Sequence, residues 1–152
     1  MRMVWGVYFR KGKVFVPTVA RAEAGYYLNV EPVAVVNAGD LNCILSAVRA
    51  AIDRGNPTIP TPTRANFPKP VLPKLAGVRS WPQFARESLY WKLRKASDGF
   101  QILPGRLEPD GGWVDDEAKA EALPSGTTAE GVAKRMAQII QAVSEDTSEP
   151  KA

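Results

Sequence analysis

Basic residues stand close to large aromatic residues in one stretch of this chain. Two groups of cations occur there: Arg64, Lys69, Lys74 and Arg79 on or just after a proline-rich segment, then Lys92, Arg94 and Lys95 on a β-rich run. Trp81, Tyr90 and Trp91 lie beside or between them. Aromatic rings among cations are typical of surfaces that bind RNA or single-stranded DNA. They also act as anchors in protein interfaces.

If the fold brings the two groups together, they form one partner-binding patch. The candidate residues of this patch are Arg64, Lys69, Lys74, Arg79, Trp81, Tyr90, Lys92 and Arg94. A plainer interpretation remains open, in which the aromatic rings belong to the core and the cations form a solvated face. Most of the four tryptophans should be buried, and one left at the surface would be a candidate anchor for a protein partner.

Catalysis is not indicated by the residue types present. The sequence contains no histidine, which removes the commonest general base and the commonest metal ligand. An enzyme would have to use Arg21, Glu23 and Tyr26, or the acidic run from Asp115 to Glu121. That run lacks the spaced ligands and the glycine of a calcium loop, so we expect a solvated acidic turn. We therefore predict a protein without enzymatic activity, metal or cofactor.

Charge is divided unevenly along the chain. Residues 1–107 hold 16 Lys and Arg against 6 Asp and Glu, whereas residues 108–152 hold 4 against 10. A basic body attracts polyanions or an acidic protein face. Alternatively, the acidic C-terminal part folds back over the basic part and neutralises it.

The N-terminal third reads as β-structure followed by a helix. Strands are expected over 4–9 and 14–16, joined by a turn at 10–13, and Pro17 should end the second strand or lie on an edge. A third strand over 26–36 should bend at Pro32. An apolar stripe then predicts a helix over 41–54, with Asp40 as its N-cap and Gly55 as its stop. We expect Cys43, the single cysteine, to be buried in this helix.

Six prolines predict an ordered, extended loop over 56–74 without helix or central strand. Ile59, Phe67, Val71 and Leu72 would anchor this loop to the domain. Its two PxxP matches could present a polyproline II face to an aromatic groove, although a structural wrap is the simpler interpretation.

The second half reads as a meander between helices. A short helix should begin at Ser80, which has capping-box spacing to Gln83. Strands follow over 89–95, 100–107 and 113–114, with the first turn at 97–99. The last helix is predicted over 128–144, with Thr127 as its cap.

Together these elements predict an α+β fold, with an antiparallel sheet packed by two main helices and one short helix. We expect one domain over residues 1–145 and a flexible acidic tail over 146–152. The apolar start of the chain meets Arg10, Lys11 and Lys13 too early for a signal-peptide core, and no run approaches the ~18 apolar residues of a membrane span. With a single thiol, a reducing compartment is indicated, and we expect the cytoplasm.

Several segments carry a resemblance to a known group of proteins. These are Trp5-Gly6-Val7-Tyr8-Phe9, Val16-Pro17-Thr18, Glu23-Ala24-Gly25-Tyr26-Tyr27 and Gly55-Asn56-Pro57. Over roughly residues 1–110 the chain resembles small bacterial αβ immunity proteins of contact-dependent growth inhibition toxin systems. The resemblance implies a protein partner, a toxin domain, but no particular site residue. The leading hypothesis is thus an immunity-type inhibitor, and the alternative is a nucleic-acid-binding module that uses the basic body.

Overall fold

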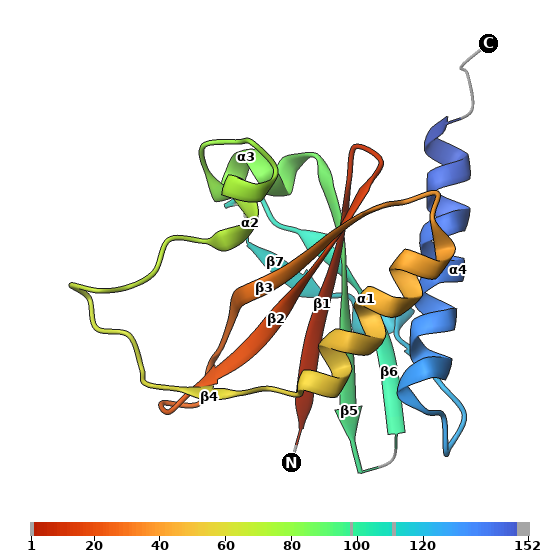
Figure 1. Ribbon diagram of the computed structural model, residues 1–152, viewed down its shortest axis with the longest axis horizontal. Coiled ribbons are helices and arrows are strands. Elements are labelled where there is room, and N and C mark those ends of the chain that lie inside the picture. Colours follow the sequence, from red (N-terminus) through yellow and green to blue (C-terminus); the bar gives the residue numbers. More distant parts are fainter. Residues whose placement is uncertain (1, 98, 111, 149–152) are drawn as a thin grey trace.

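A single sheet with helices on both faces organises the molecule (Figure 1), a computed structural model that describes residues 2–97, 99–110 and 112–148. The strand order is β3-β2-β1-β5-β6-β7, with β4 beside β2 and β8 beside β6. The strands are β1 Met3–Arg10, β2 Lys13–Ala22, β3 Tyr27–Asn37, β4 Thr58–Ile59, β5 Ser88–Ala96, β6 Gly99–Leu107, β7 Trp113–Asp115 and β8 Glu121–Ala122. The helices are α1 Leu41–Arg54, α2 Val71–Leu75, α3 Trp81–Arg86 and α4 Ala129–Ser148, with a 3-10 turn, η1, at Glu117–Lys119.

This architecture confirms the predicted α+β class. Every strand pair in the sheet is antiparallel except the short parallel pair of β2 and β4. The hairpin, the third strand and the meander all belong to the one sheet. The turn residue Asp98 lies outside the described residues, as does the end of the acidic tail.

Alternation along β1 builds two cores. Trp5, Val7 and Phe9 point to the face covered by α1 and α4, where they join the larger buried cluster. Tyr8 points the other way and packs with Phe84 and other side chains of the α2 and α3 layer. Because side chains alternate along a strand, neighbouring positions of β1 serve opposite layers.

The predicted helix ends are mostly confirmed. The Asp40 carboxylate accepts a hydrogen bond from the Cys43 amide at 3.0 Å, and Gly55 ends α1 with a φ of 68°. Ser80 caps α3 by accepting from the Gln83 amide at 3.3 Å. The cap of α4 was predicted one residue early, since Thr128 accepts from the Gly131 amide at 3.2 Å.

Cys43 was wrongly predicted to be buried. It is exposed, because it lies in the first turn of α1, where the stripe formed by Ile44, Ala47 and Val48 faces the core instead. The last helix also continues to Ser148, beyond its predicted end at 144.

Of the two positions predicted for Pro17, the end of the strand is wrong, since β2 continues to Ala22, whereas an edge position agrees with the loss of pairing to β1 beyond Phe15. Pairing of β2 with β1 stops at the Tyr8 and Phe15 pair, so the missing N–H of Pro17 interrupts no ladder with β1. On the other side, the register with β3 shifts between Pro17 and Thr18. Two extra residues of β3, Glu31 and Pro32, are accommodated at this shift, close to the predicted bend.

The proline-rich loop is also more regular than predicted. Thr58–Ile59 forms β4 and Val71–Leu75 forms α2. Pro73 is tolerated in α2 because it occupies the first turn, where backbone N–H groups have no intrahelical acceptor. Of the predicted anchors, Leu72 is fully buried, whereas Phe67 is 55% exposed.

Asn56 bridges β1 and β2 beyond the point where their direct pairing ends, which is the pair of Tyr8 and Phe15. Its side-chain amide donates to the Val4 and Val19 carbonyl oxygens at 2.7 and 2.9 Å. Its side-chain oxygen accepts from the Val4 amide at 3.1 Å. The next residues continue along β2, where the Arg21 amide donates to the Pro57 carbonyl at 2.8 Å. A short segment therefore takes the place of β1 beside the second half of β2.

Replacing Asn56 with alanine should lower the free energy of unfolding by ~2–4 kcal/mol, because three backbone groups of two strands lose their partner. Urea denaturation measures this change. The control is Asn42→Ala on the exposed surface of α1, which should change stability by less than ~0.5 kcal/mol. Equal effects of the two substitutions would contradict the bridging role of Asn56.

Candidate partner-binding site

Half of the predicted patch converges on one groove. Lys69, Lys74, Arg79 and Trp81 line a groove of about 880 Å³ beside α2 and α3, together with Glu31 and Leu75. These six residues define what we call the basic groove. Leu75 is 45% exposed, so the groove also offers apolar surface to a partner.

Local structure fixes the walls of the basic groove. Lys74 lies in α2, and Arg79 immediately precedes the Ser80 cap of α3. The turn between these helices is closed by a hydrogen bond from the Val78 amide to the Pro73 carbonyl at 3.0 Å. Leu72 and Phe84, one from each helix, are completely buried against the sheet. The two short helices are therefore anchored by their apolar side chains, while their cations stay outside.

A second hollow opens beside the groove, over the splayed strands. It has a volume of about 380 Å³ and a mainly aromatic and aliphatic lining, to which the predicted site residues Lys69 and Lys92 also contribute. We call it the aromatic cleft and define it by Gly6, Tyr8, Leu28, Phe67, Trp81 and Tyr90. Lys69 and Trp81 line both hollows, which makes the cleft and the groove neighbours.

Tyr90 forms the most constrained wall of the cleft. Its ring stacks on that of Tyr8 at 4.6 Å between centroids. A Cβ on Gly6 would lie 3.0 Å from Tyr90 Cε1, and one on Gly105 would lie 2.6 Å from Tyr90 Cδ2. These two glycines leave the room in which the Tyr90 ring lies against the sheet.

The phenols of the cleft keep their protons. Burial raises the pKa of Tyr8 to about 12, although a hydrogen bond from Asn29 at 3.2 Å opposes this effect. Burial, with smaller contributions from Tyr8 and Asp115, also raises the pKa of Tyr90 well above its usual value. At neutral pH both side chains therefore act as neutral, largely apolar walls.

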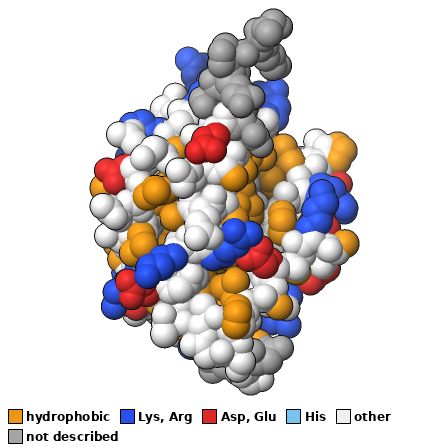
Figure 2. Space-filling model, turned by 90° about the vertical axis from the view of Figure 1, so that its right-hand side faces the viewer, with side chains coloured by type: hydrophobic (Ala, Val, Ile, Leu, Met, Phe, Trp, Pro, Cys, Tyr) orange, Lys and Arg blue, Asp and Glu red, His pale blue; other side chains and the backbone are white. Residues whose placement is uncertain are grey.

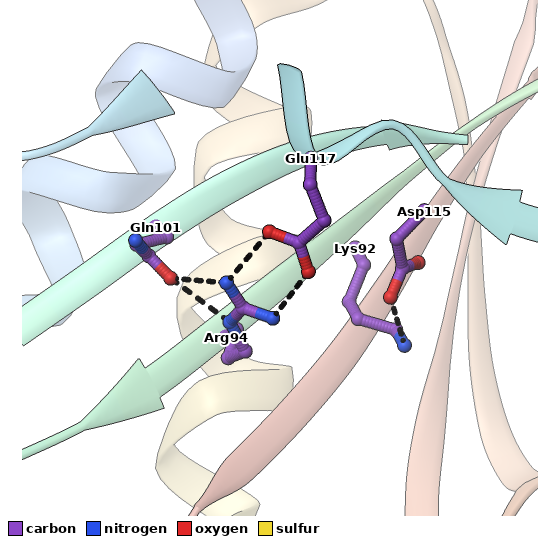
Figure 3. Close-up of polar contacts among 5 residues, drawn as sticks. All are labelled: Lys92, Arg94, Gln101, Asp115 and Glu117. Atoms are coloured by element: carbon purple, nitrogen blue, oxygen red, sulfur yellow. Dashed lines mark hydrogen bonds and ion pairs between the residues drawn. The ribbon is translucent and has the colours of Figure 1, made fainter. Parts of the chain in front are cut away.

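Lys92 and Arg94, in contrast, are neutralised by the acidic segment that follows β6 (Figure 3). Lys92 Nζ lies 2.8 Å from Asp115 Oδ2, and Arg94 Nη1 lies 3.0 Å from Glu117 Oε1. Arg94 Nε also donates to Gln101 Oε1 at 2.9 Å. The acidic run is thus not the solvated turn that the sequence predicted, because its carboxylates reach across β6 to cations of β5.

The two groups of predicted cations therefore differ in whether they form ion pairs. Lys69, Lys74 and Arg79 are exposed and form no ion pair with any residue that the structure describes. Arg64 is exposed on the proline-rich loop and lines neither hollow. The acidic segment covers the cations of the strand and leaves those of the groove available.

The face that carries α1 and α4 has a mixed character (Figure 2). Basic and acidic side chains lie next to each other across its middle. Arg49 lies 3.8 Å from Asp53 and 4.0 Å from Glu130. Arg135 lies 2.6 Å from Glu121. In these pairs each arginine lies against a carboxylate. This balance distinguishes the face from the basic groove, where the cations form no ion pair among the described residues.

Sequence reasoning missed two residues of the site. Phe67 was predicted to be a buried anchor, yet it lines the cleft while remaining half exposed. Glu31, which places a carboxylate in the groove, lies in the predicted third strand and was assigned no role there. Its place beside α2 depends on the shift in register between β2 and β3; Pro32 indicated a bend there, but not the register that results. The catalytic alternatives Arg21 and Glu23 are exposed near the turn between β2 and β3.

The described residues also bear on two other classes of site. Within these ranges no helix has both the length and the apolar character needed to cross a membrane. The same ranges contain no group of three or more Cys, Asp or Glu side chains placed to hold a metal ion.

Acid should weaken the contacts of the C-terminal segment. Hydrogen bonds from Arg94 and from Arg135 lower the pKa values of Glu117 and Glu121, respectively, below their ordinary value of 4.5. A lowered pKa in the folded state contributes stability above the unfolded value, and this contribution is lost as the pH falls through the folded value.

We therefore expect the free energy of unfolding to fall below about pH 4.5, and to fall less steeply in the variant Glu117→Gln/Glu121→Gln. The difference should be small because both carboxylates are accessible to solvent. Urea denaturation between acidic and neutral pH measures it, with Glu23→Gln/Glu31→Gln, a substitution of two exposed carboxylates, as the matched control. Identical acid slopes in the two double variants would contradict this account.

Comparison with known proteins gives a fold rather than a family. No protein-family model and no curated protein matches the chain. A protein of unknown function from Neisseria meningitidis has a TM-score of 0.66 and 11% identity, over 94% of this chain and 95% of that one. A chain of the CdiA-CT/CdiI toxin and immunity complex from Yersinia pseudotuberculosis has a TM-score of 0.60 and 12% identity, over 92% and 97%. The similarity shows a shared fold, and the second of these chains comes from a toxin and immunity complex, in keeping with the resemblance noted in the sequence.

Proposed function

We propose that this chain is a non-enzymatic, protein-binding module, an immunity-type inhibitor that acts in the cytoplasm by covering a surface of a bacterial toxin domain. One observation supports this most strongly. The basic groove presents three exposed cations, Lys69, Lys74 and Arg79, beside the half-buried ring of Trp81. Aromatic residues and Arg are enriched in protein interfaces, and exposed lysines attract a partner of opposite charge. The fold shared with a chain from a toxin and immunity complex supports the same proposal.

The nucleic-acid alternative is less well supported. Two of the cations that would contact phosphates, Lys92 and Arg94, already lie against Asp115 and Glu117. The aromatic rings contact one another, as in the stack of Tyr8 on Tyr90, rather than standing apart as platforms for bases. A protein face with acidic and apolar side chains fits this surface better.

The proposed function predicts that a toxin domain is encoded next to this gene, and the test uses that domain. The purified proteins should form a complex on size-exclusion chromatography, and calorimetry should give its affinity. The variant Lys69→Glu/Lys74→Glu should bind roughly 100-fold more weakly, because opposite charges at an interface become like charges. The matched control is Lys119→Glu/Lys134→Glu, which changes the net charge equally at exposed sites outside the groove.

Equal losses in the two double variants would contradict the use of the basic groove. Failure to form any complex would contradict the proposed function itself. If instead a single-stranded oligonucleotide binds at low salt, and its affinity falls steeply as salt is added, the nucleic-acid alternative is correct.

A further inference from the structure

We propose that the basic groove and the aromatic cleft form one continuous site for an extended, acidic peptide segment, with a large apolar side chain of the peptide inserted in the cleft. This inference deepens the proposed function, and rests on it only for the identity of the partner: it specifies which kind of segment the partner must present. Its argument depends on the shape, lining and charge of the two hollows.

Continuity comes from a shared wall. Lys69, Pro70, Val71 and Trp81 line both the groove and the cleft. A ligand that passes over this wall contacts both hollows at once. An extended chain can do so, since it rises about 3.3 Å per residue and presents successive side chains in opposite directions.

The cleft is suited to one large apolar side chain. Its volume of about 380 Å³ is near the lower end of the ~300–1,000 Å³ that ligand sites occupy. Most of its lining is aromatic, aliphatic or proline, and the phenol of Tyr8 is already the acceptor of a hydrogen bond from Asn29. Phe67, 55% exposed, stands over the cleft from the proline-rich loop and would gain most by contact with such a side chain.

The groove determines the charge of the rest of the segment. Lys69 lies at the junction, and Lys74 and Arg79 lie farther along the groove. These cations have no acidic partner among the described residues, so carboxylates of the ligand would form ion pairs with them. Glu31 lines the same groove. We therefore expect a mixed segment with two or three acidic residues rather than an unbroken acidic run.

A nucleic acid would use this site poorly. The aromatic rings of the cleft contact one another: Tyr8 meets Trp81 edge to face at 86° and stacks on Tyr90. Parallel stacking of successive bases therefore finds few free ring faces. The carboxylate of Glu31 would also repel a phosphate backbone. A peptide satisfies both the apolar cleft and the separated cations.

The experiment is selection of random peptides displayed on phage against the immobilised full chain, followed by calorimetry with the selected peptides. Enriched peptides should contain Asp or Glu within a few residues of Trp, Phe, Tyr or Leu. Lys69→Glu/Lys74→Glu should weaken their binding roughly 100-fold, and the exposed substitution Phe67→Ala about 10-fold. Lys119→Glu/Lys134→Glu should leave their affinity unchanged.

Several outcomes would overturn the inference. These are enrichment of no peptide, enrichment of basic or uncharged peptides, or binding of acidic peptides that is insensitive to both the groove and the cleft variants. Binding of oligothymidylate in the groove, lost in Lys69→Glu/Lys74→Glu without enrichment of acidic peptides, would overturn it in favour of a nucleic-acid site. The peptide selection needs no toxin domain, so its failure is distinct from failure of the proposed function.

Discussion

The separation of β1 from β2 is the constraint on which the rest of this structure depends. The two strands pair only near their hairpin, up to Tyr8 and Phe15, and the side chain of Asn56 then satisfies the backbone of both. Without that amide, the sheet would either close over the gap or leave buried polar groups unpaired. Because the strands stay apart, the cleft can form above them, and the α2 and α3 layer can place its cations at the cleft's edge.

Ion pairs within the chain determine which cations remain available to a partner. The C-terminal segment contributes Asp115 and Glu117 to cations of β5, but none of its described residues lines the basic groove. Both views of charge that the sequence left open are therefore partly right. The acidic part does fold back over the basic part, and it leaves the basic groove uncovered.

Much of the fold could be predicted from the sequence because it depends on local rules. The residue types at Asp40 and Gly55 predicted the two ends of α1, and the helical spacing of its apolar residues predicted the helix between them. The errors arose where distant segments decide the outcome. Pro17 stays in a strand because β1 has already moved away, and Pro73 is accepted by a helix that tertiary packing of Leu72 holds in place. For the site, the sequence supplied Lys69, Lys74, Arg79 and Trp81, whereas Glu31 depends on register and Arg94 on a carboxylate 23 residues away.

The most direct test of this account is lysine footprinting of the complex with the adjacent-gene toxin domain, in which acetylation of each lysine is measured by mass spectrometry with and without the partner. The account predicts that Lys69 and Lys74 become protected on binding, while Lys119 and Lys134 react as in the free protein. Protection of Lys119 and Lys134, with Lys69 and Lys74 unchanged, would show that the partner binds another face and would contradict the account.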